Sequence, residues 1–166
     1  MVRIYLASPL GFAESTRHFM EHLIERIAPH VEVTNPWDDK RFEDEFARIA
    51  QLDSRREAHA ALVRINTELG RANAESIRNA TGVVAILDGV DVDSGTAAEI
   101  GFAYALGKRC YGLRTDFRLA GDNPGSIVNL QVQYFIEASG GSVQTTIEGL
   151  LGELAGWIDR TRLSQS

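Results

Sequence analysis

The sequence predicts an α/β fold built on a parallel, doubly wound sheet. Strand patterns alternate with helix patterns along the chain, as in βαβ units joined by right-handed crossovers. The segment Gly82–Leu87 is a continuous apolar run, which is typical of a central parallel strand covered on both faces. The chain has 166 residues, enough for one domain with a sizeable core. Because it contains no internal repeat, low-complexity segment or linker, we expect residues 1–166 to form a single domain.

The N-terminal third shows two strand patterns and one clear helix pattern. Val2–Ser8 is rich in β-branched and aromatic residues and predicts the first strand. Glu14–Ala28 places apolar residues at helical spacing, and a proline follows it, so we expect a helix that ends there. Val31–Thr34 predicts a short second strand. Residues 39–57 are charge-rich and are expected to be helical only in part.

The remaining elements follow the same alternation. Ala58–Asn79 has apolar residues that step by three and four, which predicts a helix before the central strand. After that strand we expect a helix of small residues over Thr96–Leu106 and a further strand over Arg109–Arg114. Apolar residues between Ile147 and Ile158 predict an amphipathic C-terminal helix.

Two helix starts carry the spacing of a capping box. Thr145 and Glu148 suit the start of the C-terminal helix, and Thr96 and Glu99 suit the start of the small-residue helix. A capping box would place Glu99 in a first helical turn, where the helix dipole stabilises an ionised carboxylate. Spacing alone therefore allows a purely structural role for Glu99.

Composition excludes several classes of protein. The net charge of −6 excludes a general binder of the nucleic-acid phosphate backbone, which needs a basic face. Cys110 is the only cysteine, so an internal disulfide is excluded and a reducing compartment is favoured. Since no apolar run approaches the ~18–20 residues of a membrane span, we expect a cytoplasmic protein with no membrane partner.

Doubly wound sheets bind their ligands outside the carboxyl ends of the strands. This rule selects three loops, Ser8–Ala13, Asn35–Lys40 and Asp88–Thr96, each of which follows a predicted strand. The third is the most informative, because three acids within six residues stand at the mouth of a buried strand.

Carboxylates in this segment are suited to cleaving a glycosidic bond. In that chemistry one carboxylate acts as the nucleophile and a second moves a proton. Glu99 is the candidate nucleophile, and Asp93 or Asp88 is the candidate proton carrier. The reaction needs neither a metal nor an organic cofactor, and the sequence shows no cluster of metal ligands, so we expect none.

Three blocks of the sequence resemble the nucleoside 2-deoxyribosyltransferase family. They are IYLASPL at residues 4–10, DGVDVDSGTAAEIG at 88–101 and VNLQ at 128–131, with agreeing spacing between them. The resemblance implies a flavodoxin-like α/β sandwich with a mostly parallel five-stranded sheet. It also implies transfer of 2-deoxyribose between nucleobases with retention, in nucleotide metabolism and base salvage. The partners would be small nucleosides and nucleobases.

The resemblance also assigns roles to residues. Glu99 would attack the anomeric carbon and hold the sugar covalently, Asp93 would protonate the base, and Tyr5 would orient Glu99 by a hydrogen bond. Phe12 would lie against the base or the sugar. Asn129 matches an asparagine that the family supplies to a neighbouring subunit's site, which implies a homo-oligomer, a dimer or a trimer of dimers.

Four further residues are candidates for substrate binding. Asn73 and Gln131 stand where family members often carry an aspartate and a methionine. Trp37 could stack on a base or pack half-buried in the protein. Asp88 could belong to the site or anchor the end of the central strand.

Two other functions remain open at this stage. A nucleoside or nucleotide N-glycoside hydrolase would use the same Glu99 and let water complete the reaction. Action on nucleotides would need a phosphate grip, for which Ser8, Ser15 and Arg17 are candidates. A non-catalytic nucleotide sensor would bind without turnover.

Overall fold

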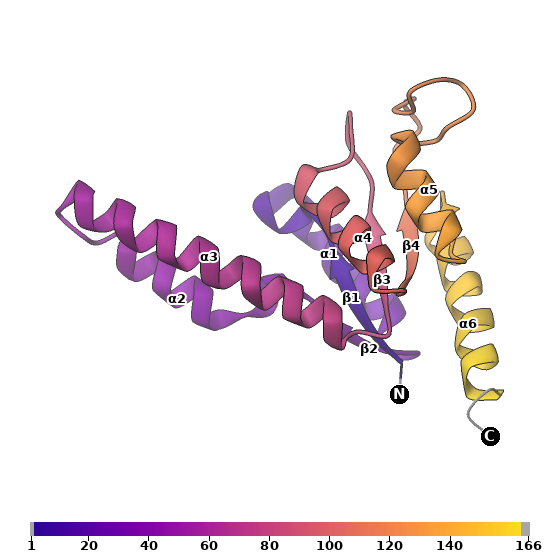
Figure 1. Ribbon diagram of the computed structural model, residues 1–166, viewed down its shortest axis with the longest axis horizontal. Coiled ribbons are helices and arrows are strands. Elements are labelled where there is room, and N and C mark those ends of the chain that lie inside the picture. The colour runs from indigo at the N-terminus through magenta and orange to yellow at the C-terminus, as the bar shows by residue number, and fades with distance from the viewer. Residues whose placement is uncertain (1, 164–166) are drawn as a thin grey trace.

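The computed structural model describes residues 2–163 and contains a sheet of five strands, all parallel. The strand order is β2-β1-β3-β4-β5, which is the flavodoxin-like order (Figure 1). The predicted fold class is therefore confirmed. The strands are β1 (Arg3–Ala7), β2 (Glu32–Thr34), β3 (Gly82–Ile86), β4 (Arg109–Leu113) and β5 (Val143–Gln144).

Helices cover both faces of this sheet. One face packs against α1 and α6, and the other packs against α4, α5 and the C-terminal end of α3. Two short 3₁₀ helices, η1 and η2, follow β1 and β2. The helices are η1 (Leu10–Phe12), α1 (Glu14–Ile27), η2 (Pro36–Asp38), α2 (Lys40–Ile49), α3 (Arg55–Asn79), α4 (Ser94–Ala105), α5 (Leu130–Ala138) and α6 (Ile147–Leu163).

The central strands divide their side chains between two cores. Ile4 and Leu6 of β1 face the α1 and α6 side, whereas Tyr5 faces the α4 side, as the alternation of a strand requires. All five residues of β3 are buried, as the apolar run predicts. Tyr5 is therefore held rigidly beside Val83, its register partner on β3, at the carboxyl half of the sheet.

The predicted strands and helices occur close to their expected bounds, except that α6 continues past Ile158 to Leu163. Two helix starts are corrected. The helix α4 begins at Ser94, because the Asp93 carboxylate accepts the N–H of Thr96. Glu99 consequently lies in the second turn of α4. The N-cap of this helix is Asp93 and not Thr96. At α6 the hydroxyl of Thr146, and not that of Thr145, accepts the N–H of Gly149.

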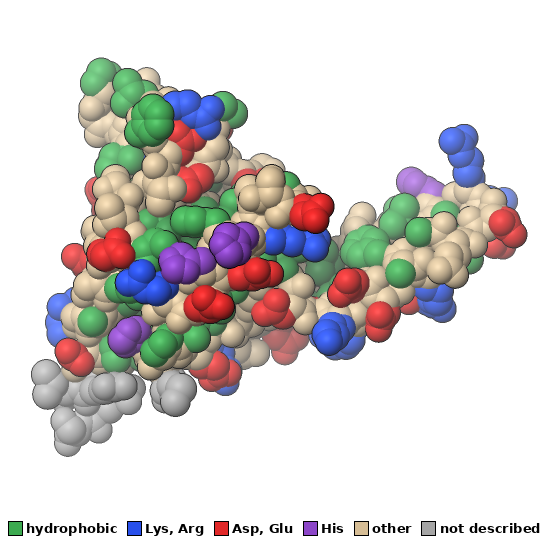
Figure 2. All heavy atoms as spheres, turned by 180° about the vertical axis from the view of Figure 1, so that it is seen from behind, with side chains coloured by type: hydrophobic (Ala, Val, Ile, Leu, Met, Phe, Trp, Pro, Cys, Tyr) green, Lys and Arg blue, Asp and Glu red, His purple; other side chains and the backbone are tan. Residues whose placement is uncertain are grey.

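The helices α2 and α3 form a hairpin that extends away from the sheet (Figures 1 and 2). We call this hairpin the arm. A small apolar cluster of Ile49, Ala61 and Ile65 joins its two helices. The inner part of α3 packs against α4, so the base of the arm lies beside the segment that carries Glu99.

Among residues 2–163, no helix combines the length and the apolar character that crossing a membrane requires.

Candidate active site

The three loops selected from the sequence meet at one cavity of about 500 Å³. The loop after β1, the loop after β2 and the start of α4 form the side that belongs to the sheet, and the arm forms the opposite side. The cavity is lined by Ser8, Phe12, Pro36, Trp37, Phe46, Asn66, Leu69, Asn73, Asp93, Ser94, Gly95, Thr96 and Glu99.

Glu99 lies at the inner end of this cavity, against β1. The Tyr5 hydroxyl donates a hydrogen bond of 2.6 Å to Oε1 of Glu99, across 94 residues of sequence. Tyr5 has no exposed surface, so the sheet fixes its hydroxyl and the hydroxyl orients the carboxylate. Burial and the neighbouring carboxylate together raise the pKa of Tyr5, which keeps the phenol protonated as a donor.

The environment of Glu99 raises the pKa of its carboxyl above the ordinary value of 4.5. Burial is the largest cause, and the negative charge of Asp93 adds to it, while the hydrogen bonds from Tyr5 and Asn73 act in the opposite direction. The Asn73 amide donates at 3.4 Å, also to Oε1. Within residues 2–163, Oε2 of Glu99 accepts no hydrogen bond, so this oxygen is available to a ligand.

Asp93 combines a structural contact with exposure to the cavity. Its Oδ2 accepts the N–H of Thr96 at 3.0 Å and the hydroxyl of Thr96 at 3.3 Å. Its Oδ1 has no partner among the described residues. One carboxylate can therefore cap the helix through one oxygen and exchange a proton with a ligand through the other.

Two aromatic rings, on the loops that follow β1 and β2, form a wall of the cavity. Phe12 and Trp37 pack edge to face, with ring centroids 4.5 Å apart. The indole N–H of Trp37 donates to the carbonyl of Ser8 at 2.9 Å, which ties the two loops together. Gly11 permits this arrangement, because a Cβ there would lie 2.0 Å from Cδ2 of Trp37. Trp37 therefore packs against Phe12 and also lines the cavity, and its stacking on a base stays a prediction.

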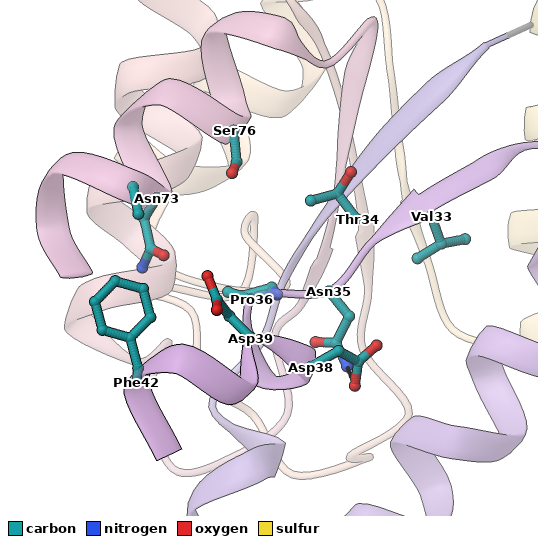
Figure 3. Close-up of a pocket in the computed structure, with 10 residues that line it drawn as sticks. Val33, Thr34, Asn35, Pro36, Asp38, Asp39, Phe42, Asn73 and Ser76 are labelled. Carbon is teal, nitrogen blue, oxygen red and sulfur yellow. Dashed lines mark hydrogen bonds between the residues drawn. The ribbon is translucent and has the colours of Figure 1, made fainter. Parts of the chain in front are cut away.

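A second, more polar cavity of about 320 Å³ lies on the other side of Asn73. Figure 3 shows Asn73 of α3 above Phe42 of α2 and across from Pro36. Asn35 stabilises the intervening turn, because its side chain accepts the N–H of Trp37 and donates to Asp38. Asn73 and Pro36 line both cavities, so they form the partition between them.

Three of the predicted site residues lie away from the 500 Å³ cavity. The carboxylate of Asp88 accepts the N–H groups of Thr115 and Asp116, at 2.6 and 2.8 Å, and so joins the loops after β3 and β4. Asn129 caps α5 by accepting the N–H of Gln131 at 3.0 Å. Gln131 itself is exposed.

The arm contributes residues that the sequence analysis did not select. Phe46 of α2 and Asn66 and Leu69 of α3 line the cavity opposite the aromatic wall. Asn66, Leu69 and Asn73 follow the spacing of a single helix face, which was the signal available in the sequence. The direction in which the arm extends could not be predicted, so this face had no assigned partner.

Across residues 2–163, no group of three or more His, Cys, Asp and Glu side chains is arranged to hold a metal ion.

Solved structures share this architecture. A conserved protein from Enterococcus faecalis is 25% identical with a TM-score of 0.67, over 94% of this chain and 98% of that chain. A 2-deoxyribosyltransferase from Bacillus psychrosaccharolyticus is 21% identical with a TM-score of 0.62, over 90% of each chain. A CMP N-glycosidase from Clostridium botulinum is 21% identical with a TM-score of 0.52, over 93% of this chain and 98% of that chain. No curated protein matches the sequence.

The flavodoxin-like sheet and the half-buried Glu99 carboxylate bonded to Tyr5 define a class of α/β protein with a candidate site on the loops after β1, β2 and β3. The sequence model of one family, described as nucleoside 2-deoxyribosyltransferase, matches residues 4–131. The chain therefore belongs to the nucleoside 2-deoxyribosyltransferase family. Members of this family are glycosyltransferases and N-glycosidases. Membership therefore supports the prediction that this chain is an enzyme.

Proposed function

We propose that this chain is a nucleoside 2-deoxyribosyltransferase that acts through a covalent deoxyribosyl intermediate on Glu99. The observation that carries the proposal is the 2.6 Å hydrogen bond from Tyr5 to Oε1 of Glu99 inside the cavity. This bond leaves Oε2 free and fixes its direction. A fixed, partly desolvated carboxylate is the equipment that attack on an anomeric carbon requires.

In the first step Oε2 of Glu99 forms a bond to the anomeric carbon of a 2′-deoxynucleoside. The bond from that carbon to the base nitrogen breaks, and its electron pair stays with the base. Asp93, entering this step in its protonated form, gives that proton to the departing base through Oδ1 and is left as a carboxylate. In the second step an incoming base attacks the same carbon, its proton passes to Asp93, and Glu99 leaves as a carboxylate. Two inversions give net retention.

The surrounding residues have roles in holding the base. Phe12 and Trp37 offer aromatic surface for the base, since Phe12 is 78% exposed at the mouth of the cavity. Asn73 donates to Glu99 and can also present its carbonyl to the base. Asp88 acts indirectly in this scheme, by fixing the loop that leads to Asp93.

A nucleoside fits the cavity better than a nucleotide does. Within residues 2–163, the lining includes no Lys, Arg or His side chain that could bind a phosphate. Arg17, a candidate phosphate ligand, donates to the carbonyl of Gly11 and lines an adjacent cavity on the other side of Trp37. Ser8 accepts the N–H of Leu10. These contacts support a neutral substrate.

We also propose that the active unit is a homo-oligomer in which Asn129 and Gln131 reach the cavity of a neighbouring subunit. In support, neither residue lines the cavity of its own chain. The segment that carries them is rich in exposed apolar side chains, which gather on the loop between β4 and α5 (Figure 2). The most exposed apolar side chains of this segment are those of Phe117 and Leu119 in the loop and of Tyr134 in α5.

Chromatography of a simple mixture tests the reaction. The protein is incubated with deoxyinosine, with and without free adenine. Deoxyadenosine should form only when adenine is present. Release of hypoxanthine at one rate with or without adenine, and no new nucleoside, would contradict transfer and indicate a hydrolase. Binding by calorimetry with no turnover of any purine or pyrimidine deoxynucleoside would indicate a sensor.

A further inference from the structure

The arm forms one side of the 500 Å³ cavity. Phe46 of α2 and Leu69 of α3 present apolar surface there, and Asn66 presents an amide. Asn66 lies seven residues before Asn73 on α3. These three residues have no role in the bond-breaking steps above.

The geometry of α3 sets the distance of Asn66 from the reacting carboxylate. Asn66 and Asn73 are seven residues apart, so they lie on one face of the helix and about 10 Å apart along its axis. Asn73 donates to Glu99 at 3.4 Å, which places it at the inner end of the cavity. Asn66 therefore lies at the outer end, beyond the reach of a sugar bonded to Glu99.

The Asn66 amide has unused hydrogen-bonding capacity. Asn66 is an exposed residue at the mouth of the cavity, and among the described residues nothing donates to its side chain or accepts from it. An amide both donates and accepts, which matches the edge of a nucleobase, where ring nitrogens alternate with amino or oxo groups. Phe46 lines the same cavity as Phe12 and Trp37, so a flat ring bound there can contact apolar surface with its far edge toward Asn66.

We propose that Asn66 selects the base, by hydrogen bonding to the edge remote from the sugar, and that this contact favours two-ring purines over one-ring pyrimidines. A purine extends further from the anomeric carbon than a pyrimidine does, and only the longer base spans the cavity from Glu99 to Asn66. This inference rests on the proposed function, because it assumes that the sugar is held at Glu99.

The test measures binding, so that it does not depend on turnover. Deoxyadenosine and deoxycytidine are titrated by calorimetry into Glu99→Gln protein, with and without Asn66→Ala. The second substitution should weaken deoxyadenosine binding by about three- to tenfold, the effect of losing one neutral hydrogen bond, and change deoxycytidine binding less than twofold. Alanine favours the helix, so α3 should be preserved. Asn79→Ala is the matched control, an exposed asparagine on α3 outside the cavity.

The outcomes separate the two proposals. If Asn66→Ala weakens the binding of both nucleosides equally, or of neither, the assignment of Asn66 is overturned. This holds even if wild-type protein exchanges bases. If Asn66→Ala weakens deoxyadenosine alone but wild-type protein never cleaves it, the base contact stands and the transferase is overturned. If neither nucleoside binds to the Glu99→Gln protein and wild-type protein cleaves neither, both proposals are overturned.

Discussion

Glu99 combines two properties that normally oppose each other. It is buried enough to raise its pKa, and it receives two hydrogen bonds that favour its ionised form. The result is a carboxylate that is poorly solvated yet held in one orientation. This balance suits a nucleophile, because solvating water does not have to be removed before attack, and the free Oε2 is aimed by the bonds to Oε1.

The raised pKa makes a prediction about stability. Between pH 4.5, the ordinary value, and the raised pKa, the folded state binds more protons than the unfolded state, so stability falls as the pH rises through this range. Glu99→Gln removes this cost and can still accept the bond from Tyr5. At pH 7 the variant should melt higher than wild type, by about 2–4 °C for each kcal/mol gained. The difference should vanish below pH 4.5.

Thermal unfolding of both proteins from pH 4 to pH 8 measures this effect. Glu153→Gln, on the exposed side of α6, is the control and should follow wild type at every pH. Equal melting temperatures for Glu99→Gln and wild type at pH 7 would contradict the burial cost assigned to Glu99.

The role of Asp93 as the proton donor can be separated from its role as a helix cap. Asparagine caps helices as well as aspartate does, so Asp93→Asn should keep α4 intact. Departure of a neutral base should slow by about 10²–10⁴-fold, as expected for loss of general acid catalysis. The base of a 7-methylated purine nucleoside leaves without taking up a proton. Asp93→Asn should therefore not slow the cleavage of such a nucleoside. A rate within threefold of wild type for deoxyinosine would show that another group is the acid.

At the scale of elements, the strands β1 to β4 and the helices α1, α3, α4 and α6 were predictable because each has helical spacing or a run of apolar or β-branched residues, whereas α5 was not predicted. β5 has two residues and was too short for any pattern to reveal it. The start of α4 was misplaced because Thr96 and Glu99 have capping-box spacing, yet Asp93 offers a carboxylate that accepts from Thr96. The contact from Tyr5 to Glu99 came from the family resemblance, since the sequence alone does not pair residues on β1 and α4.

The close approach of η1 to Trp37 leads to a prediction about the aromatic wall formed by Phe12 and Trp37. Gly11→Ala places a Cβ against the Trp37 ring, so the ring must move and the bond from Trp37 to Ser8 should break. We expect a loss of about 1–3 kcal/mol in stability, as for other overpacked sites, together with a lower kcat/KM.

Gly70→Ala is the matched control for this substitution. Gly70 lies on α3, and a Cβ added there would meet no atom within 4 Å, so alanine should be neutral or slightly stabilising. Unfolding and kinetics of both variants measure the difference. Gly11→Ala behaving like Gly70→Ala would mean that the position of Trp37 does not depend on Gly11.

At the scale of the whole molecule, the arm and the exposed loop after β4 extend from opposite ends of the sheet (Figure 1). The charge-rich residues 39–57 were expected to be helical only in part, and only the structure shows that the arm closes one side of the cavity. Asn129 and Gln131 do not line the cavity that the arm closes. Their predicted role therefore depends on a neighbouring chain.

Subunit mixing tests that dependence. Asn129→Ala and Glu99→Ala should each inactivate the protein, whereas a mixture that has exchanged subunits should recover part of the activity, up to about a quarter for a dimer with random assortment. Each mixed dimer carries one site with both native residues. Mass spectrometry of the intact oligomer establishes that exchange occurred. No recovery after proven exchange would contradict a shared site.

The central claim is that the sugar is carried on Glu99, and peptide mapping tests it most directly. Wild-type protein is mixed with deoxyinosine alone, quenched in acid at short times, digested and analysed by mass spectrometry. We predict a deoxyribosyl group on the peptide that contains Glu99, which disappears when adenine is added as deoxyadenosine forms. The sugar on a different side chain, or undiminished turnover by Glu99→Gln, would contradict the claim.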